Sequence, residues 1–328
     1  MIRQATALAA MLSAAMLLGA TTASAFDLQG HRGARGLAPE NTVAGFQRAL
    51  AAGVTTIELD LAMTREGVLV AHHDVRLHPD IARRDGAYIE PPGPAIRSLT
   101  LEELRFYDVG RLKPGSAYAR QFPGQAPADG APVPTLEEVF ALVRPHPGVR
   151  LNIETKLTPT SGLEAPDPGT FATAVASAVR ASGMADRVTV QSFDWRTLLV
   201  LRGIAPEIRR ACLTSEGAQD TVGRRSGRGA SPWTAGFSLR DFGDSTPRLA
   251  AAAGCGVWSP AWRDLTRERV EEGQGLGMEV IPWTVNERAD MERLIGWGVD
   301  GIITDYPDRL RAVMAARGME LPRRVTAR

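Results

Sequence analysis

TIELDLAM, at residues 56–63, carries more structural information than any other segment of the chain. Aliphatic side chains alternate along it with Glu58 and Asp60, and this period of two predicts a β-strand with both carboxylates on one face. In a barrel covered outside by helices, the apolar face packs outward and the two acids point into the interior. The segment therefore predicts a barrel strand that delivers two acids to a site.

LNIETKL, at residues 151–157, repeats this alternation, and its inner face carries Glu154 and Lys156. Two strands thus bring three acids and one lysine into the same interior. Three carboxylates that converge without a cation repel one another and raise their own pKa values. Oxygen ligands favour Mg²⁺ or Ca²⁺ over zinc, so Glu58, Asp60 and Glu154 predict a site for one divalent cation.

Eight such β-rich runs follow one another along the chain, and amphipathic helical patterns separate most of them. The runs are residues 27–33, 55–63, 149–157, 187–193, 209–214, 255–260, 279–285 and 300–305. The helical patterns are residues 43–52, 135–143, 170–182, 195–202, 266–273 and 287–295. Repeated strand–helix units pair in parallel, so they predict an α/β fold, a TIM-type (β/α)8 barrel. The alternative, an open doubly wound sheet, is disfavoured because no glycine-rich dinucleotide motif follows the first strand.

Residues 75–134 interrupt this regular order. The segment is dense in proline and glycine, and its one helix candidate is residues 101–104. It is predicted to be an insertion between strand 2 and helix 2. Two interpretations stay open: the insertion shapes substrate access at the mouth of the barrel, or it is a solvated surface excursion. Residues 217–229, rich in Arg, Ser and Gly, are predicted to be a mobile loop rather than an anion site.

The first 25 residues have the features of a secretory signal peptide. Arg3 precedes an apolar run of Ala, Leu and Met, and ASA at residues 23–25 is a small-residue cleavage site. We expect cleavage before Phe26, a barrel over residues 26–316 and a frayed tail at residues 317–328. An uncleaved anchor is the minority alternative. The mature protein is therefore expected in the periplasm or in the secreted fraction.

The charge balance argues against polyanionic partners. The chain has 38 Lys+Arg and 37 Asp+Glu, and the predicted leader removes one base and no acid, which leaves 37 of each. Without an overall field, binding to nucleic acid or to an anionic membrane is not expected. Affinity for phosphate must be local, so the expected ligand is a small molecule. No protein partner is predicted.

Cys212 and Cys255 are the two cysteines of the chain, and in an exported protein they invite a disulfide. Cys212 falls late in one apparent strand, whereas Cys255 opens the next. In a parallel pair these positions differ in height by roughly ten ångströms, at ~3.3 Å per residue. That height exceeds the usual Cα reach of a bridge, so two unpaired thiols are predicted.

The chain after Asp60 is predicted to form a hairpin, because too few residues precede His73 for a parallel crossover. A two-residue turn at residues 66–67 would set Asp60 opposite His73 and turn His73 inward. A three-residue turn would shift this pairing. His72 points the other way and is interpreted as structural.

His31 ends the first strand, at the edge where barrels present catalytic groups. Beside a cation, His31 and His73 form a plausible acid/base pair, because imidazole titrates near neutral pH. Arg32 is a candidate to hold a phosphoryl oxygen, with a loop salt bridge as the alternative. Together these residues point to hydrolysis of a phosphate ester.

Two further segments have structural explanations of their own. Trp283 is a candidate apolar wall for the carbon skeleton of a substrate, although a buried barrel tryptophan is nearly as plausible. Asn41 and Thr42 precede an amphipathic helix, and helix capping alone explains both.

Seven ordered motifs resemble those of the glycerophosphodiester phosphodiesterases. They are HRG, PENT, ELD, HHD, IETK, WTVN and GVDGIITD, and they span nearly the whole mature chain. The resemblance implies a TIM-type barrel with an insertion between strand 2 and helix 2, one divalent cation, Ca²⁺ or Mg²⁺, and hydrolysis of glycerophosphodiesters to sn-glycerol 3-phosphate and an alcohol.

The resemblance also implies a role for each matched residue. By motif, Glu58, Asp60 and Glu154 hold the metal, and His31 and His73 are the acid and base. Arg32 and Lys156 grip phosphate, and Trp283 packs near glycerol. These eight assignments are the expected site residues.

Other functions remain possible on the same pattern. A phospholipase D-like or lysophospholipid phosphodiesterase shares the arrangement but needs an apolar rim, and the insertion has no aliphatic run. A periplasmic protein that binds phosphodiesters without cleaving them is disfavoured, because paired histidines add nothing to affinity. The nucleophile, water or the glycerol 2-hydroxyl, stays open, as do the preferred alcohol and the oligomeric state.

Overall fold

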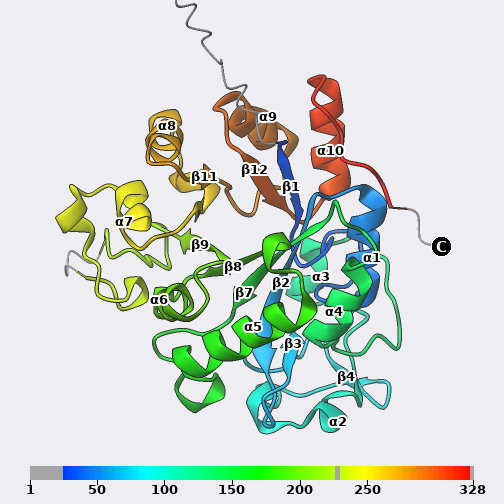
Figure 1. Cartoon of the computed structure of the whole chain (residues 1–328). Coiled ribbons are helices and arrows are strands. Elements are labelled where there is room, and N and C mark those ends of the chain that lie inside the picture. Colours follow the sequence, from blue (N-terminus) through cyan, green and yellow to red (C-terminus); the bar gives the residue numbers. More distant parts are fainter. Residues whose placement is uncertain (1–24, 226–229, 326–328) are drawn as a thin grey trace, which may run out of the picture.

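The computed structural model describes residues 25–225 and 230–325, and eight parallel strands form its centre (Figure 1). These strands are β1 (Asp27–Gly30), β2 (Thr56–Met63), β7 (Arg150–Thr155), β8 (Val188–Ser192), β9 (Arg209–Thr214), β10 (Val257–Pro260), β11 (Glu279–Val280) and β12 (Gly301–Thr304). From β1 to β11 each strand pairs in parallel with the next in this series, and β12 pairs with β1. The eight strands coincide with the eight predicted runs.

Backbone hydrogen bonds between the β11 segment and β12 close the barrel. The amide of Asp300 donates to the carbonyl of Val280 at 3.0 Å, and that of Ile303 donates to Pro282 at 3.0 Å. The TIM-type barrel is therefore confirmed, and the open sheet is excluded.

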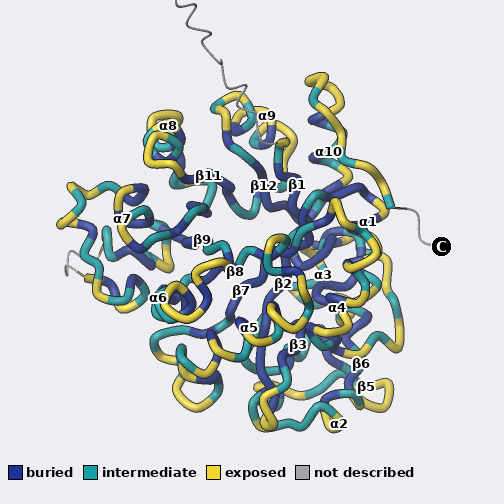
Figure 2. Tube along the Cα trace, viewed as in Figure 1, coloured by how far each residue is buried: buried dark blue, intermediate teal, exposed yellow. Residues whose placement is uncertain are grey.

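Helices cover the outside of this barrel. They are α1 (Val43–Ala52), α4 (Leu136–Val143), α5 (Pro168–Ser182), α6 (Trp195–Ile204), α7 (Thr246–Ala252), α8 (Arg267–Gly275), α9 (Arg288–Gly296) and α10 (Pro307–Ala316). Six of them were predicted from periodicity, whereas α7 and α10 were not. Buried aliphatic and aromatic side chains fill the layer between strands and helices, and Figure 2 shows the strands buried and the outer helix faces exposed. A fully buried side chain such as Phe46 contributes roughly 1.5–3 kcal/mol of hydrophobic free energy.

The hairpin after β2 differs from its predicted register. Strand β3 (Leu69–Ala71) pairs with β2 so that Ala62 faces Val70. This register is shifted by one residue from the predicted register, in which Asp60 faces His73. The cause is a three-residue turn: Thr64 and Val68 bond across it, and Gly67 takes a left-handed φ of 89°. The predicted Asp60–His73 strand pair is therefore wrong.

The insertion between strand 2 and helix 2 is present and has its own small core. It contains β4 (Arg83–Arg84), β5 (Ala87–Tyr88), β6 (Tyr107–Asp108), α2 (Leu101–Leu104) and α3 (Ala117–Gln121). Helix α2 has the predicted bounds, and α3 was not predicted. A separate cluster that includes Leu77, Ile96 and Leu104 holds the insertion together.

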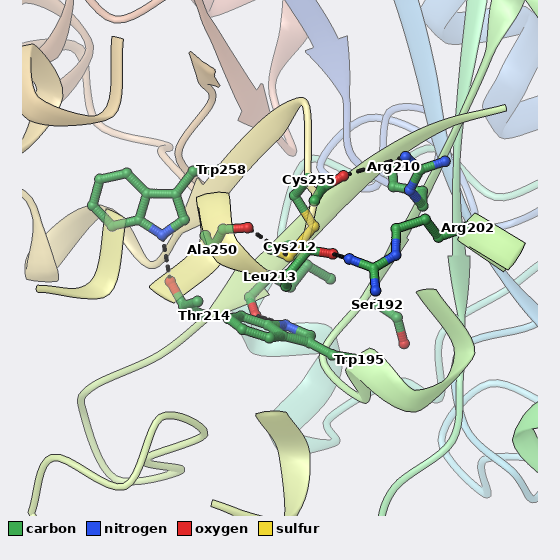
Figure 3. Close-up of a disulfide and its surroundings, with 12 residues drawn as sticks. Ser192, Trp195, Arg202, Arg210, Cys212, Leu213, Thr214, Ala250, Cys255 and Trp258 are labelled. Atoms are coloured by element: carbon green, nitrogen blue, oxygen red, sulfur yellow. Dashed lines mark hydrogen bonds between the residues drawn. A yellow bond between two sulfur atoms is a disulfide. The ribbon is translucent and has the colours of Figure 1, made fainter. Parts of the chain in front are cut away.

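Cys212 and Cys255 form a disulfide, which corrects the prediction of two free thiols (Figure 3). The prediction extended the β10 ladder back to Cys255, but β10 begins at Val257. The chain instead turns at Gly254, with φ of 81°, and the amide of Cys255 donates to the carbonyl of Ala250 in α7 at 3.3 Å. The two Cα atoms are consequently 5.8 Å apart, within the normal reach of a bridge.

Within residues 25–225 and 230–325, no helix has both the length and the apolar character that a membrane span requires. Residues 1–24, nearly all of the predicted leader, and residues 226–229 of the predicted mobile loop lie outside the described residues.

Candidate active site

Three buried carboxylates meet inside the barrel. Glu58 and Asp60 project from β2, and Glu154 projects from β7, where it is the register partner of Asp60. One oxygen of each lies within 4.8 Å of the others. The alternation of each strand turned these acids inward, as the sequence predicted.

The environment of the three acids suits a divalent cation. Burial, followed by repulsion from Asp60 and Glu154, raises the pKa of Glu58 well above its usual range. Burial also raises the pKa of Glu154 to about 7. Asp60 Oδ1 is buried and has no hydrogen-bond partner. A buried oxygen without a hydrogen bond, among repelling carboxylates, is what a bound Mg²⁺ or Ca²⁺ would satisfy.

Cationic side chains hold Asp60 ionised. Burial opposes its charge, but Arg32, helped by Lys156, outweighs burial and lowers the pKa of Asp60 well below its usual range. Arg32 Nε lies 3.2 Å from one carboxylate oxygen of Asp60, and Lys156 Nζ lies 3.7 Å from the other. Lys156 also donates to Glu154 at 2.7 Å. Arg32 and Lys156 therefore bring positive charge to the predicted metal ligands.

His31 follows β1 and contacts both an acid and the predicted metal ligands. Its Nδ1 bonds to Asp305 at 2.7 Å, and its Nε2 lies 4.0 Å from Glu58 Oε2. Because an ionised carboxylate only accepts, we infer that Nδ1 carries the proton and that Nε2 presents a lone pair. Burial, followed by the charge of Arg35, lowers the pKa of His31 to about 4.

His73 reaches the same site by a route that strand alternation does not describe. Strand β3 ends at Ala71, and the chain then bends, so His73 is freed from the ladder. Its Nδ1 bonds to Asp74 Oδ1 at 2.7 Å. Burial, followed by Arg32 and Lys156, lowers the pKa of His73 to about 4. The neighbouring His72 is buried and bonds to the carbonyl of Asp74 at 2.9 Å, in keeping with a structural role.

Trp283 forms part of an aromatic wall. Its indole nitrogen donates to the carbonyl of Ser259 at 3.0 Å, and its ring meets Phe193 edge-on at 5.2 Å between centroids. The ammonium of Lys156 lies 5.9 Å from the Phe193 ring. Phe193 was not predicted as a site residue, because a single aromatic after a strand carries no distinctive signal.

All predicted site residues except Asp60 line one cavity of about 180 Å³. The seven are His31, Arg32, Glu58, His73, Glu154, Lys156 and Trp283. Asp60 is fully buried and does not line the cavity, but its carboxylate is paired with Arg32 and Lys156, which do. Residues distant in sequence, on β1, β2, β7 and the β11 segment, are thus gathered at the carboxyl edge of the barrel, where TIM barrels carry their active sites.

Asn41 contacts a predicted metal ligand, which the sequence interpretation missed. Its side-chain amide donates to Asp60 Oδ2 at 2.9 Å, and its side-chain oxygen accepts from the Asp60 amide at 3.1 Å. Thr42 alone caps α1, by accepting from Gly45. Asn41 has a left-handed φ of 51°, which asparagine tolerates better than most residues. The explanation by capping therefore holds for Thr42 and fails for Asn41.

Two other acids support the basic residues of the site. Glu40 accepts from Arg32 Nη1 at 2.7 Å, and Asp305 accepts from Arg35 Nε at 2.8 Å as well as from His31. The position of Asp305, directly after the last strand, was a signal that could have found it. Glu40 lies in PENT but carries no pattern that separates it from a surface acid.

A chain of buried polar side chains runs through the barrel to the carboxylates. Asp27 accepts from Gln29, and the Asn152 amide donates to both Gln29 and Gln191, at 2.9 and 2.8 Å. Gln191 then donates to Glu58 Oε1 at 2.9 Å. Glu58 thus accepts hydrogen bonds at both carboxylate oxygens, one from Gln191 and one from the backbone amide of Arg32, at 2.7 Å.

Comparison with known proteins supplies an independent line of evidence. A family model described as the glycerophosphoryl diester phosphodiesterase family matches residues 31–309. A glycerophosphodiester phosphodiesterase of Caldanaerobacter subterraneus is 28% identical over 281 residues, covering 85% of this chain and 94% of that protein. One of Bacillus subtilis is 29% identical over 291 residues, covering 86% of this chain and 84% of that protein.

Solved structures share the architecture. A Silicibacter pomeroyi protein, provisionally described as a glycerophosphoryl diester phosphodiesterase, is 34% identical with a TM-score of 0.80, covering 91% of this chain and 96% of that one. An Oleispira antarctica phosphodiesterase, solved with its product sn-glycerol-3-phosphate, is 20% identical with a TM-score of 0.63, covering 88% and 96%. At that identity, the second likeness concerns the fold.

Proposed function

Because the chain belongs to the glycerophosphoryl diester phosphodiesterase family, and is therefore a phosphodiester hydrolase, we propose that it cleaves glycerophosphodiesters to sn-glycerol 3-phosphate and an alcohol with one divalent cation and two histidines. The observation that carries the proposal is the meeting of Glu58, Asp60 and Glu154 within 4.8 Å of one another, beside a cavity that both His31 and His73 line. The product bound by the Oleispira antarctica relative is consistent with this substrate class.

Glu58, Asp60 and Glu154 would hold the cation through oxygen ligands, as Ca²⁺ or Mg²⁺ prefers. When bound, the cation supplies Lewis-acid polarisation of a phosphoryl oxygen and offsets charge in the transition state. Asn41 and Gln191 keep two of the ligands oriented through hydrogen bonds. Arg32 and Lys156 add positive charge for the phosphate.

His31 and His73 divide the proton transfers. With pKa values of about 4, both rings are neutral near pH 7 and one can accept a proton from the nucleophile. An anionic diester in the pocket raises imidazole pKa values, which favours a protonated partner for the leaving alkoxide. Asp305 and Asp74 stabilise the positive form of each ring.

The nucleophile is water or the glycerol 2-hydroxyl. The second route passes through a cyclic phosphate, which phosphorus NMR distinguishes from the direct products. A cyclic signal that rises and decays during turnover supports the intramolecular route, and its absence under trapping conditions supports water.

The preferred substrates are proposed to be small and water-soluble rather than lysolipids. The exposed large hydrophobic residues of the described chain are scattered over separate elements; they are Val43, Phe106, Leu163, Ile204, Leu276 and Leu321. A lysolipid enzyme would gather such residues into a rim at the cavity.

The protein is proposed to act in the periplasm or outside the cell, after cleavage of residues 1–25. The Cys212–Cys255 disulfide supports this location, because disulfides persist in oxidising compartments. Comparing the mass of the exported protein with that of the full chain tests the cleavage, and retention of residues 1–25 would oppose it.

The central test measures hydrolysis of glycerophosphocholine, glycerophosphoethanolamine and bis(p-nitrophenyl) phosphate, with and without chelator. Chelation should abolish turnover, and Ca²⁺ or Mg²⁺ should restore it. The His31→Ala and His73→Ala variants should each lose about 10²–10⁴-fold in kcat while still binding metal and substrate. His146→Ala, at a residue that does not line the cavity, is the matched control. Unchanged rates in both site variants would remove the acid/base assignment.

A further inference from the structure

A second cavity, of about 260 Å³, borders the first. The two share Arg35 and Thr284 in their linings. The second is formed by the loops that follow β11 and β12 and by Gln121 and Phe122 at the end of α3. The insertion therefore contributes directly to a space that opens beside the proposed reaction centre.

The second cavity lies where the leaving alcohol of a diester bound in the first cavity could extend. Asp305 lines it, and the same carboxylate bonds to Nδ1 of His31, whose ring lines the first cavity. Arg35 stands between the two spaces, with its guanidinium paired to Asp305. A diester with its phosphate in the first cavity can thus extend its alcohol past Arg35 and Thr284, which line both cavities, into the second.

The aromatic faces of the second cavity already have cations against them. The guanidinium carbon of Arg309 lies 4.2 Å from the centre of the Tyr306 ring, and that of Arg35 lies 4.7 Å from the centre of Phe122. A quaternary ammonium is recognised by such faces. Here it would have to displace a guanidinium and would meet positive charge.

The remaining lining is polar and suits hydroxyl groups. Thr284 is half-buried, Gln121 is exposed, and the side-chain amide of Asn286 donates to Asp305 at 2.7 Å. Glu287 adds a carboxylate, but its side chain is 76% exposed and Arg309 pairs with it at 3.5 Å. The cavity therefore offers hydrogen-bond partners without a free aromatic face or an unpaired acid.

We propose that this second cavity receives the alcohol part of the diester and selects uncharged, hydroxyl-bearing alcohols, such as glycerol or inositol, over quaternary ammonium alcohols such as choline. The inference rests on the proposed function, because it assigns a leaving-group subsite to the same reaction. Arg309 acts as the residue that excludes choline.

The test compares kcat/KM for glycerophosphoglycerol and glycerophosphocholine. The wild type should prefer glycerophosphoglycerol. Arg309→Ala, which uncovers the Tyr306 ring, should shift the ratio towards glycerophosphocholine by roughly threefold to tenfold. Gln121→Glu, which adds a carboxylate at the exposed rim, should shift it in the same direction. Arg311→Ala, on the same helix but bonded to Gly53 and Pro322, should leave the ratio unchanged.

The outcomes separate the two proposals. If the wild type hydrolyses neither diester, the proposed function fails. If it hydrolyses both but prefers glycerophosphocholine, or if Arg309→Ala and Gln121→Glu both leave the ratio unchanged, only the subsite assignment is overturned. An equal shift in Arg311→Ala would also overturn it, because that residue lies outside the cavity.

Discussion

Asn41 and Thr42 are adjacent, and the structure gives them different tasks. Thr42 accepts from Gly45 at the start of α1, whereas Asn41 makes two hydrogen bonds with Asp60. Hydrogen-bond partners of metal ligands orient the ligands and set their basicity. The pair therefore allows helix stability to be separated from metal affinity at neighbouring positions.

Replacing each residue by alanine should have distinct effects. Asn41→Ala should weaken divalent-cation binding by about 10–100-fold, because Asp60 loses its orienting partner. Thr42→Ala should lower the free energy of unfolding by about 1 kcal/mol and leave cation affinity unchanged. Isothermal titration calorimetry and urea denaturation measure the two quantities. Equal cation affinity in both variants would contradict the role of Asn41.

Cation affinity should depend on pH through Glu154. Because its pKa in the cation-free protein is about 7, the carboxyl is mostly protonated below that pH and must release a proton to bind. The apparent Kd should therefore weaken as pH falls below 7, by about tenfold per pH unit for each proton displaced. Calorimetry in buffers of different ionisation enthalpy counts the protons; a flat Kd between pH 5 and 8 would contradict the assignment.

Helix α3 links the insertion to the proposed phosphate-binding residue. The hydroxyl of Tyr118 donates to Glu40, which holds Arg32, and it accepts from Arg35 at 3.3 Å. Of the two interpretations of the insertion, the one that places it at the mouth of the barrel is favoured by these contacts. The insertion is thus a structural support for the site as well as part of its wall.

Removing this hydroxyl should affect substrate binding more than chemistry. Tyr118→Phe keeps the ring that packs against Phe122 but loses about 1 kcal/mol of hydrogen bonding, so KM should rise about fivefold with little change in kcat. Tyr88→Phe, whose hydroxyl donates to the carbonyl of Leu112 elsewhere in the insertion, is the matched control. Steady-state kinetics at one cation concentration measure both constants. A KM of Tyr118→Phe equal to that of the wild type would exclude the link between the insertion and substrate binding.

The disulfide acts on the whole molecule. It joins positions 43 residues apart, on β9 and just before β10, and so restricts the unfolded chain. The Cys212→Ala/Cys255→Ala double variant should lose about 2–4 kcal/mol of unfolding free energy yet keep its kcat, since the bridge lies outside the cavity. Dithiothreitol should destabilise the wild type similarly and leave the variant unaffected. An unfolding midpoint of the wild type that stays the same after reduction would contradict this expectation.

The barrel was predictable because its signals are local. Alternation in residues 56–63 and 151–157 specifies strands and the inner face of each, and repetition of strand and helix specifies parallel closure. Helix α7, of seven residues, and α3, of five, escaped detection because brief amphipathic runs beside proline or glycine carry a weak periodic signal. Helix α10 was missed as well, although with ten residues it is as long as α1. The predicted barrel was correct without these three helices.

The site was predictable to the extent that strands direct side chains. Glu58, Asp60 and Glu154 follow from alternation, whereas Asn41, Asp305 and Tyr118 reach the site from loops and from the insertion. Sequence spacing does not encode the path of a loop, which depends on packing against the rest of the fold.

Local patterning alone specified a closed barrel with acids inside it, since side-chain direction in a strand is set by period and needs no distant partner. Tertiary packing decided the rest: the three-residue turn that frees His73 from the ladder, the bend at Gly254 that joins Cys212 to Cys255, and the second cavity at the end of α3. Each depends on where separate segments meet, and a shift of one residue or one turn changes which side chains face each other.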